Sequence, residues 1–354
     1  MQDYEIIEFI DQIEYIKEFL TLPKRLYKKR EIMQNEEEEN QILKNRHILS
    51  KYFKVHKFLV LNKRKKAVAR AIVTFYENDE KAYIGFFECV KDYNISNYFL
   101  DYIERFVKRN GYNGIIGPLN CSFWIGYRFK VDNYNRPYFG EPYNKDYYPI
   151  MFEKAGFNIL QEYSSNIFSR VNKDQENRIY TNRLKSLKEK GYEFIEPNED
   201  TFYEQLIQIG KMILDLYSKF PAYKSISEED FFQMYKDLKK IVDYSMIKLA
   251  YYNNQMVGFF ISIPNYRNYI NRKKYISALI QKMMKKEYIL MYLGVNKDHL
   301  GIGRALAEEI KEELKKKRST SIGALIKKGN ANSVYFKELI TKEYKYVLYE
   351  KNFK

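Results

Sequence analysis

The stretch LMYLGVNKDHLGIGRALAEEIKEEL, residues 290–314, runs from an apolar segment through a turn with two glycines into a helical pattern. Leu306, Ile310 and Leu314 recur every four residues, with carboxylates on the opposite side. This spacing places the three apolar side chains on one face of a helix. The sequence therefore predicts a strand, a tight turn and an amphipathic helix in direct succession.

The glycines of this turn, Gly301 and Gly303, favour an anion site. A turn that leads straight into a helix presents free backbone N–H groups and the positive end of the helix dipole to one point. A residue without a side chain lets a diphosphate approach these groups. The stretch is neither a GxxxxGK[ST] loop nor a full GxGxxG fingerprint, because Leu306 stands at the last position. Taken alone, an ordinary turn in which glycine only relieves crowding explains it equally well.

The chain on either side of this stretch repeats one order of elements in its two halves. Apolar alternation and turn residues predict strands, a hairpin, a strand, a helix and further strands in each half. In the second half, residues 244–252 and 255–263 read as a hairpin around Asn253 and Asn254. At 354 residues the chain exceeds the usual size of one core, so we predict two α+β units, residues 1–175 and 176–354.

Composition narrows the class of protein. Apolar residues make up 45% of the chain, and no run approaches the roughly 18 apolar residues of a membrane span. The acidic N-terminus lacks a signal-peptide core, so we expect a cytoplasmic protein without a membrane partner. Two cysteines and three histidines without ligand spacing predict no metal site. Cys89 and Cys121 are too few for a disulfide framework.

The formal net charge of +15 lies mainly in the second half, much of it in residues 266–286 and 311–318. Such charge attracts an anionic cofactor, an anionic substrate or RNA. A basic solvated surface is the simpler explanation, since Lys, Tyr, Asn and Ile are abundant throughout. Charge alone does not identify the partner.

The order strand, hairpin, strand, DHLGIGRAL, helix, strand, GNANSVYFKEL and strand resembles the GNAT superfamily of acetyl-CoA dependent N-acyltransferases. In that family the turn reads Gln or Arg, two residues, Gly, one residue, then Gly or Ala. Gly301 and Gly303 match it, whereas Asp298 stands at the Gln/Arg position. The resemblance implies two tandem GNAT-like domains, each with a mixed, mostly antiparallel sheet flanked by helices. Residues 117–144 are similar to a subgroup of tandem bacterial proteins of this kind.

The resemblance also implies a cofactor site in the second half. The strands before and after the turn would splay apart and hold the pantetheine of acetyl-CoA. The residues that it implies for binding coenzyme A are Leu293, Val295, Gly301, Ile302, Gly303, Arg304, Ala305, Asn330 and Asn332. Tyr335 would protonate the leaving sulfur, and Glu287 would deprotonate the amine directly or through water. Asparagine is also a common helix N-cap, which would explain Asn330 or Asn332 equally well.

The first half resembles the same fold, most clearly at residues 143–157, but its equivalent turn at 88–99 contains no glycine. We therefore expect no working coenzyme site there. Aromatic and basic residues of this half are predicted to line an acceptor cleft between the two units, unless they only pack the interface. These residues are Trp124, Tyr127, Arg128, Tyr138 and Tyr143.

Three classes of function remain. The first is an N-acetyltransferase that moves an acetyl or longer acyl group from acetyl-CoA to the amine of a small molecule or peptide. The second is an aminoacyl-tRNA dependent transferase, because some peptidoglycan enzymes pair two GNAT-like domains; the intact anion site favours coenzyme A over RNA. The third is a non-catalytic module that binds coenzyme A or a partner. The sequence names neither the acceptor nor the oligomeric state.

Overall fold

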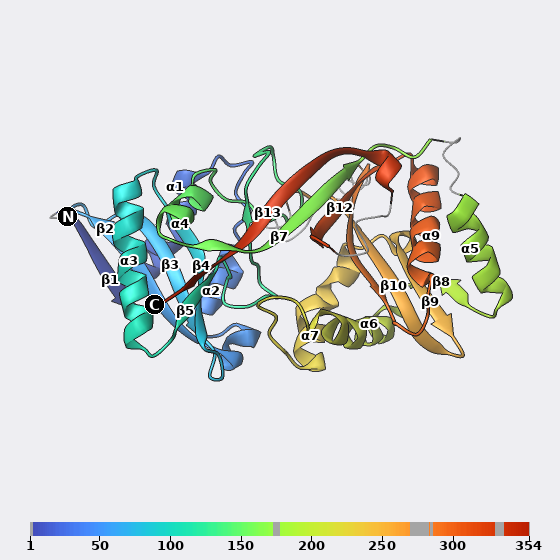
Figure 1. The fold of residues 1–354 in the computed structure, drawn as a ribbon, viewed down its shortest axis with the longest axis horizontal. Coiled ribbons are helices and arrows are strands. Elements are labelled where there is room, and N and C mark those ends of the chain that lie inside the picture. The colour runs from blue at the N-terminus through green and yellow to red at the C-terminus, as the bar shows by residue number, and fades with distance from the viewer. Residues whose placement is uncertain (1–2, 173–177, 270–282, 284–285, 330–335, 354) are drawn as a thin grey trace.

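The structure, a computed structural model, describes residues 3–172, 178–269, 283, 286–329 and 336–353 (Figure 1). Helices and strands are combined as the sequence predicts, in an α+β fold built on one mixed sheet. Within the described residues only β4–β5 and β11–β12 pair in parallel, and the other neighbours are antiparallel.

We call the part of the chain up to residue 172 the N-terminal half. Its strands are β1 (Tyr4–Phe9), β2 (Lys54–Asn62), β3 (Ala67–Phe75), β4 (Lys81–Cys89), β5 (Gly114–Gly117), β6 (Phe129–Lys130) and β7 (Asn158–Phe168). Its helices are α1 (Ile13–Leu26), α2 (Glu36–Leu43), the 3₁₀ turn η1 (Ile48–Tyr52), α3 (Tyr93–Arg109) and α4 (Tyr148–Lys154).

The C-terminal half follows from residue 178. Its strands are β8 (Glu193–Ile195), β9 (Ile247–Tyr252), β10 (Gln255–Pro264), β11 (Glu287–Val295), β12 (Thr320–Lys327) and β13 (Ile340–Asn352). Its helices are α5 (Arg178–Glu189), α6 (Phe202–Tyr217), α7 (Glu228–Tyr235) and α9 (Ile302–Lys317), with 3₁₀ turns η2 (Lys236–Lys240), η3 (Tyr244–Met246) and η6 (Lys337–Leu339).

The two halves exchange strands at the centre of the sheet. The strand order is β1-β2-β3-β4-β5-β13-β7-β12-β11-β10-β9-β8. The last strand, β13, therefore lies beside β5 of the N-terminal half, and β7 lies beside β12 of the C-terminal half. Figure 1 shows β7 and β13 as the long pair that crosses the middle of the molecule. The predicted boundary at residue 175 lies outside the described residues and stays a prediction.

Helices cover both faces of the sheet. In the N-terminal half α3 and α4 pack on one face, while α1 and α2 contribute to a core cluster on the other. That second cluster continues into the C-terminal half, where it includes side chains of α6. Helices α5 and α9 cover the opposite face there. One continuous core thus joins the two halves along the face where the cavities described below open.

Local sequence explains the elements around the predicted turn. Asn253 and Asn254 both adopt positive φ, 48° and 60°, which a two-residue hairpin between β9 and β10 requires. Leu306 and Ile310 are fully buried and Leu314 nearly so, which confirms the predicted apolar face of α9. Each such side chain contributes roughly 1.5–3 kcal/mol by leaving water. The opposite face of α9 is not bare, because Thr181 of α5 donates a hydrogen bond to Glu308.

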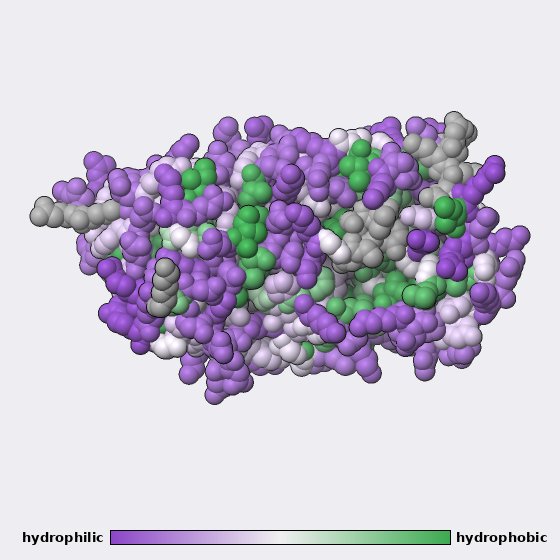
Figure 2. All heavy atoms as spheres, viewed as in Figure 1, coloured by the Kyte–Doolittle hydropathy of each residue, from purple (hydrophilic) through white to green (hydrophobic). Residues whose placement is uncertain are grey.

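The surface in Figure 2 is mainly hydrophilic, with hydrophobic side chains in small separate groups. None of the described helices is long and apolar enough to cross a membrane. In the same part of the chain no three His, Cys, Asp or Glu residues gather as metal ligands. Cys89 and Cys121 are both buried and free.

Candidate functional site

The strands β11 and β12 separate about halfway along their length. They pair in parallel only from Glu287 opposite Thr320 to Leu290 opposite Gly323. Beyond that point β11 continues along β10, and β12 continues along β7 with an irregularity between Gly323 and Ile326. A bulge at Met291, where β11 has one residue more than β10, accompanies the separation. The result is an open gap between two strands inside the sheet.

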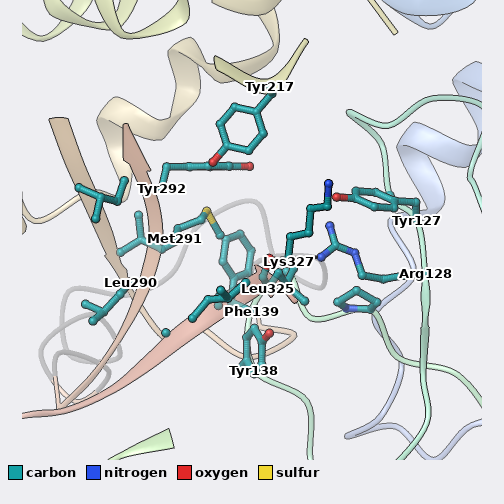
Figure 3. A pocket seen from close by; sticks show the side chains of 18 of the residues that line it. Tyr127, Arg128, Tyr138, Phe139, Tyr217, Leu290, Met291, Tyr292, Leu325 and Lys327 are labelled. Atoms are coloured by element: carbon teal, nitrogen blue, oxygen red, sulfur yellow. Dashed lines mark hydrogen bonds between the residues drawn. The ribbon is translucent and has the colours of Figure 1, made fainter. Parts of the chain in front are cut away.

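A cavity of about 350 Å³ occupies this gap (Figure 3). Its walls come from β11, from β12, from α6 and α7, and from two loops of the N-terminal half. Figure 3 shows Met291 and Tyr292 on the β11 side, with Arg128 and Lys327 reaching in from the other side. The cavity therefore lies where the two halves meet and where the sheet is open.

The predicted turn leads into the N-terminus of α9. Gly301 is the N-cap residue with φ of +90°, and no side chain caps the helix within the described residues. The amides of Arg304 and Ala305 bond back to the carbonyl of Gly301, at 3.2 and 3.3 Å. Ile302 anchors the turn by burying its side chain, while its backbone stays part of the first turn. An uncapped helix start of this kind favours an anionic ligand.

Arg183 of α5 lies directly over this turn. A Cβ atom at position 301 would come within 2.4 Å of Arg183 Nε and 2.9 Å of its Nη2. A cation at the N-terminus of a helix is unfavourable unless an anion lies between them. Arg183 forms no ion pair with the described residues, and Arg304 adds an exposed positive charge on α9 itself. A side chain at position 301 would displace the guanidinium, so glycine lets it approach the helix start.

The remaining residues predicted for the cofactor divide into two groups. Leu293 lines the cavity, and Val295 follows it on the part of β11 that pairs with β10 alone. Gly303 and Ala305 are buried in the first turn of α9. Asn330, Asn332 and the predicted acid Tyr335 lie outside the described residues.

Glu287, predicted as the base, lies at the start of β11, where the strands are still paired. Its carboxylate accepts hydrogen bonds from the side-chain amide of Asn265 and from Arg267 Nη2, the latter at 2.7 Å. It does not line the cavity. The carboxylate of Glu287 is therefore already engaged in an ion pair with Arg267, away from the gap.

Four of the five predicted acceptor residues line the cavity: Trp124, Tyr127, Arg128 and Tyr138. The indole of Trp124 is fixed by a 2.7 Å hydrogen bond to the carbonyl of Lys224. Tyr143 lines a second cavity in the N-terminal half instead. Trp124, Tyr127 and Arg128 come from one stretch of the chain and Tyr138 from another; that they bind an acceptor stays a prediction.

Arg128 is the buried cation of this cavity. It is 8% exposed, adopts φ of +76°, and stacks between the rings of Tyr127 and Tyr163 at 3.7 and 4.1 Å from their centroids. Its Nη1 donates to the carbonyl of Leu325 at 3.5 Å, and its Nε has no partner in the described residues. A guanidinium held by aromatic faces and without a carboxylate can receive an anionic group of a ligand.

The other polar groups of the cavity are Lys327 and several tyrosines. Burial raises the pKa of the hydroxyls of Tyr217, Tyr235 and Tyr292 above the usual value, so they are neutral donors at physiological pH. No Asp, Glu or His is found among the described residues that line the cavity. The site thus combines two cations with neutral hydroxyls and apolar walls.

Arg183 and Lys327 were not predicted as site residues. Arg183 lies shortly after the predicted boundary at residue 175, and Ile179, Arg183 and Leu187 repeat at the spacing of one helix face. Lys327 ends a strand whose outward divergence from β11 depends on pairing with the distant β7. No local sequence pattern predicts that β12 diverges from β11.

Comparisons with solved structures find the same fold, whereas comparisons of sequence find no match. No family model and no curated protein sequence matches the chain. A solved tandem GNAT protein from the clavulanic acid biosynthesis pathway is similar, with a TM-score of 0.53 and 9% identity over 99% of this chain and 98% of that chain.

A GCN5-related glucosamine N-acetyltransferase region of a fungal multi-domain GH3 β-N-acetylglucosaminidase is also similar. It has a TM-score of 0.56 and 13% identity over 98% of this chain, and the match spans 38% of that longer protein. At such identities the likeness is one of fold. The chain has the tandem GNAT fold.

Proposed function

We propose that this protein is an acyl-CoA dependent N-acyltransferase that binds its acyl donor in the C-terminal half. The observation that carries the proposal is the open gap between β11 and β12, which ends at an uncapped helix start under Arg183. An extended donor with a diphosphate fits both features, because its diphosphate has amides and a guanidinium to bind and its arm has an unpaired strand edge.

The residues proposed for the donor follow from these positions. The first turn of α9, from Gly301 to Ala305, would hold the diphosphate together with Arg183 and Arg304. The free edge of β11 at Leu293 and Val295 would hold the pantetheine arm. Asn330 and Asn332 stay part of the proposal from the family resemblance alone.

Coenzyme A, when bound, supplies the acyl group as a thioester. In the reaction the amine nitrogen bonds to the thioester carbon, the C–S bond breaks, the thiolate takes up a proton, and the amine loses one. The neutral hydroxyls around the cavity, among them Tyr292, can donate hydrogen bonds to the developing oxyanion or the sulfur. Tyr335 stays the proposed proton donor to the sulfur.

The cavity itself would favour the neutral, reactive form of the amine. Apolar walls disfavour an ammonium ion, and the positive charges of Arg128 and Lys327 disfavour it further. The same two cations would attract an anionic group elsewhere on the acceptor. The proposed acceptor is therefore a small amine with an apolar or aromatic body and an acidic group.

Two measurements test this proposal. Calorimetric titration with acetyl-CoA should show one binding site per chain, and a thiol-release assay with a panel of amines should detect free coenzyme A only when a suitable amine is present. Binding without thiol release for any amine would support a non-catalytic coenzyme A module. Binding of RNA but not of acetyl-CoA would support the aminoacyl-tRNA dependent alternative and overturn the proposal.

A further inference from the structure

A second cavity, of about 420 Å³, lies in the N-terminal half between β4 and the segment from α1 to α2. Loops 118–129 and 139–144 close its other side. It shares residues 125–128, Phe139, Gly140 and Pro142 with the first cavity as a common wall, but it contains no residue of the proposed acyl-donor site. It needs a separate explanation.

Glu88 of β4 is a carboxylate in this cavity whose nearest cation also pairs with a second carboxylate. Its Oε2 accepts a 2.7 Å hydrogen bond from the Tyr148 hydroxyl, and its side chain is 13% exposed. Arg70 Nη2 lies 3.9 Å from Oε1, but the guanidinium is committed to Glu39, at 2.8 and 3.2 Å, and to the carbonyl of Phe19. Glu39 therefore neutralises Arg70, and Glu88 is left to another partner.

Two buried polar atoms beside Glu88 have no hydrogen-bond partner among the described residues. The first is the hydroxyl of Tyr27, whose residue is 8% exposed. It lies close enough to Glu88 for the two groups to affect each other's pKa, without a hydrogen bond of standard geometry. The second is Nε of Arg70, in a residue 2% exposed; it is a donor on a cation and offers nothing to an ammonium group. Leaving the Tyr27 hydroxyl unsatisfied costs about 1–3 kcal/mol, unless a ligand bonds to it.

The charge of the cavity differs from that of the protein. Five carboxylates and two guanidinium groups line it, in a chain with a net charge of +15. Lys130 pairs with Glu141 from outside the lining, and Arg70 pairs with Glu39. This leaves Glu31, Glu38 and Glu88 against Arg128. Glu38 also lies 3.7 Å from Nε2 of His47, and Lys145 Nζ lies over the Tyr27 ring at 4.5 Å from its centroid. Aromatic side chains complete the walls: Tyr27, Phe86, Phe87, Tyr127, Phe139 and Tyr143.

We propose that this cavity binds a small organic cation, whose ammonium group pairs with Glu88, donates to the Tyr27 hydroxyl and packs against the aromatic walls. Aromatic faces and an unpaired carboxylate are the elements with which proteins hold ammonium groups. The size of the cavity suits a molecule with one ring or a short chain. This proposal does not depend on the acyltransferase activity.

The charge state of Glu88 gives the proposal a pH dependence. Burial raises the pKa of its carboxyl to about 7, against the lowering effect of Arg70. The groups that face it are Arg70 of β3, Glu39 of α2, Tyr27 after α1, and Tyr147 and Tyr148 at α4. Only the ionised carboxylate attracts an ammonium ion, so binding strengthens as the pH rises through this value. Between pH 6 and pH 8 the expected gain in affinity is about tenfold.

The experiment is a calorimetric titration of the full chain with benzylamine, and with benzyl alcohol as a neutral probe of the same shape. We expect saturable binding of benzylamine that is tighter at pH 8 than at pH 6, and no binding of the alcohol. Equal binding of both probes, no binding of either, or an affinity independent of pH would overturn the proposal.

Three variants assign the binding to this cavity. Glu88→Gln keeps the acceptor for Tyr148 and should abolish benzylamine binding. Tyr27→Phe should weaken it severalfold while the unliganded protein stays as stable or becomes more so, because an unsatisfied hydroxyl is removed. Glu14→Gln removes a carboxylate exposed on α1 and should change nothing.

Acetyl-CoA binding should be the same in all three variants, which separates this proposal from the proposed acyltransferase. Unchanged benzylamine affinity in Glu88→Gln would overturn the assignment to this cavity.

Discussion

Helices α3 and α9 occupy equivalent places in the two halves but begin in opposite ways. In α3 the side chain of Asp92 accepts hydrogen bonds from the amides of Asn94 and Ile95. In α9 the N-cap is Gly301, which has no side chain to offer, and Arg183 lies over it. One helix start is therefore closed by a carboxylate of its own chain, and the other is left open for an anion.

The gap between the parallel strands beside α3 is closed, whereas the gap beside α9 is open. Between β4 and β5 the chain closes on itself, because the amide of Leu119 bonds to the carbonyl of Ile84 and the side chain of Asn120 accepts from the amide of Phe86. Gly85 permits this approach, since a Cβ there would lie 2.0 Å from the Leu119 carbonyl oxygen. Between β11 and β12 no such closure is found in the described residues.

The comparison teaches that the fold alone does not provide a donor site. Both halves have diverging parallel strands and a helix that starts nearby. A capping aspartate and one loop that bonds across the gap fill the site in the N-terminal half. This supports the expectation that only the C-terminal half binds a coenzyme, which stays a prediction.

The largest expected effect comes from making α9 begin like α3. Gly301→Asp should weaken acetyl-CoA binding by about 100-fold or more, because the new carboxylate competes for the first-turn amides and repels a diphosphate. Aspartate and asparagine tolerate positive φ better than other residues. Gly301→Asn is the matched control, with the same shape and no charge, and should lose less. Calorimetric affinities equal to wild type in both variants would contradict the donor site.

A second prediction concerns Glu88 in the N-terminal half. Its folded pKa, raised by burial from 4.5 to about 7, lies above its unfolded value. The folded state then holds the proton more tightly, so this contribution to stability is complete below pH 4.5 and is lost as the pH rises through 7. Relative to Glu88→Gln, the wild type should lose roughly 2–3 kcal/mol of unfolding free energy between pH 5 and pH 8.5. Urea denaturation at both pH values measures this; parallel behaviour of the two proteins would show that Glu88 is not perturbed.

A third prediction tests the guanidinium over the open helix. Arg183→Ala should weaken acetyl-CoA binding by about tenfold, and the loss should be greater at low salt. The unliganded protein should not be destabilised, because a cation is removed from the positive end of a helix. Lys185→Ala removes an exposed cation of the same helix and serves as the control. If both variants lose affinity equally, the effect of Arg183 is only one of general charge.

The smallest expected effect is that of opening α3. Asp92→Ala should lower the unfolding free energy by about 1 kcal/mol, the usual cost of a lost N-cap. It should not create a second coenzyme site, because Leu119 and Asn120 still close the gap. The stoichiometry of acetyl-CoA binding should therefore remain one per chain. A stoichiometry of two would mean that the Asp92 cap alone prevents the N-terminal half from binding acetyl-CoA.

Local patterns in the sequence predicted the parts of the fold that local forces determine. The four-residue spacing of Leu306, Ile310 and Leu314 identified α9, and the two asparagines identified the hairpin of β9 and β10. The turn before α9 was predicted because the residues that form it are adjacent in the chain; its role in binding an acyl donor stays a proposal. Gly301 of this turn adopts a positive φ, which glycine does at no steric cost.

Features built by distant segments were not predicted. The exchange of β7 and β13 depends on pairing between strands more than a hundred residues apart, and nothing in YKYVLYEKNF distinguishes a neighbour in one half from a neighbour in the other. The cavity around Glu88 combines side chains from α1, α2, β3, β4 and the loops 118–129 and 139–144. Glu287 was chosen for its place on a strand, but its carboxylate bonds to Arg267 and Asn265, which lie 20 and 22 residues earlier.

The position of β13 also constrains the order in which the protein can be completed during synthesis. This strand is made after all the other described strands, yet it fills the space between β5 and β7, which are made much earlier. Until it has emerged, both of those strands expose unpaired edges, and the first half of the nascent chain cannot close its sheet. Premature termination before residue 340 would therefore damage the half that had already been translated in full.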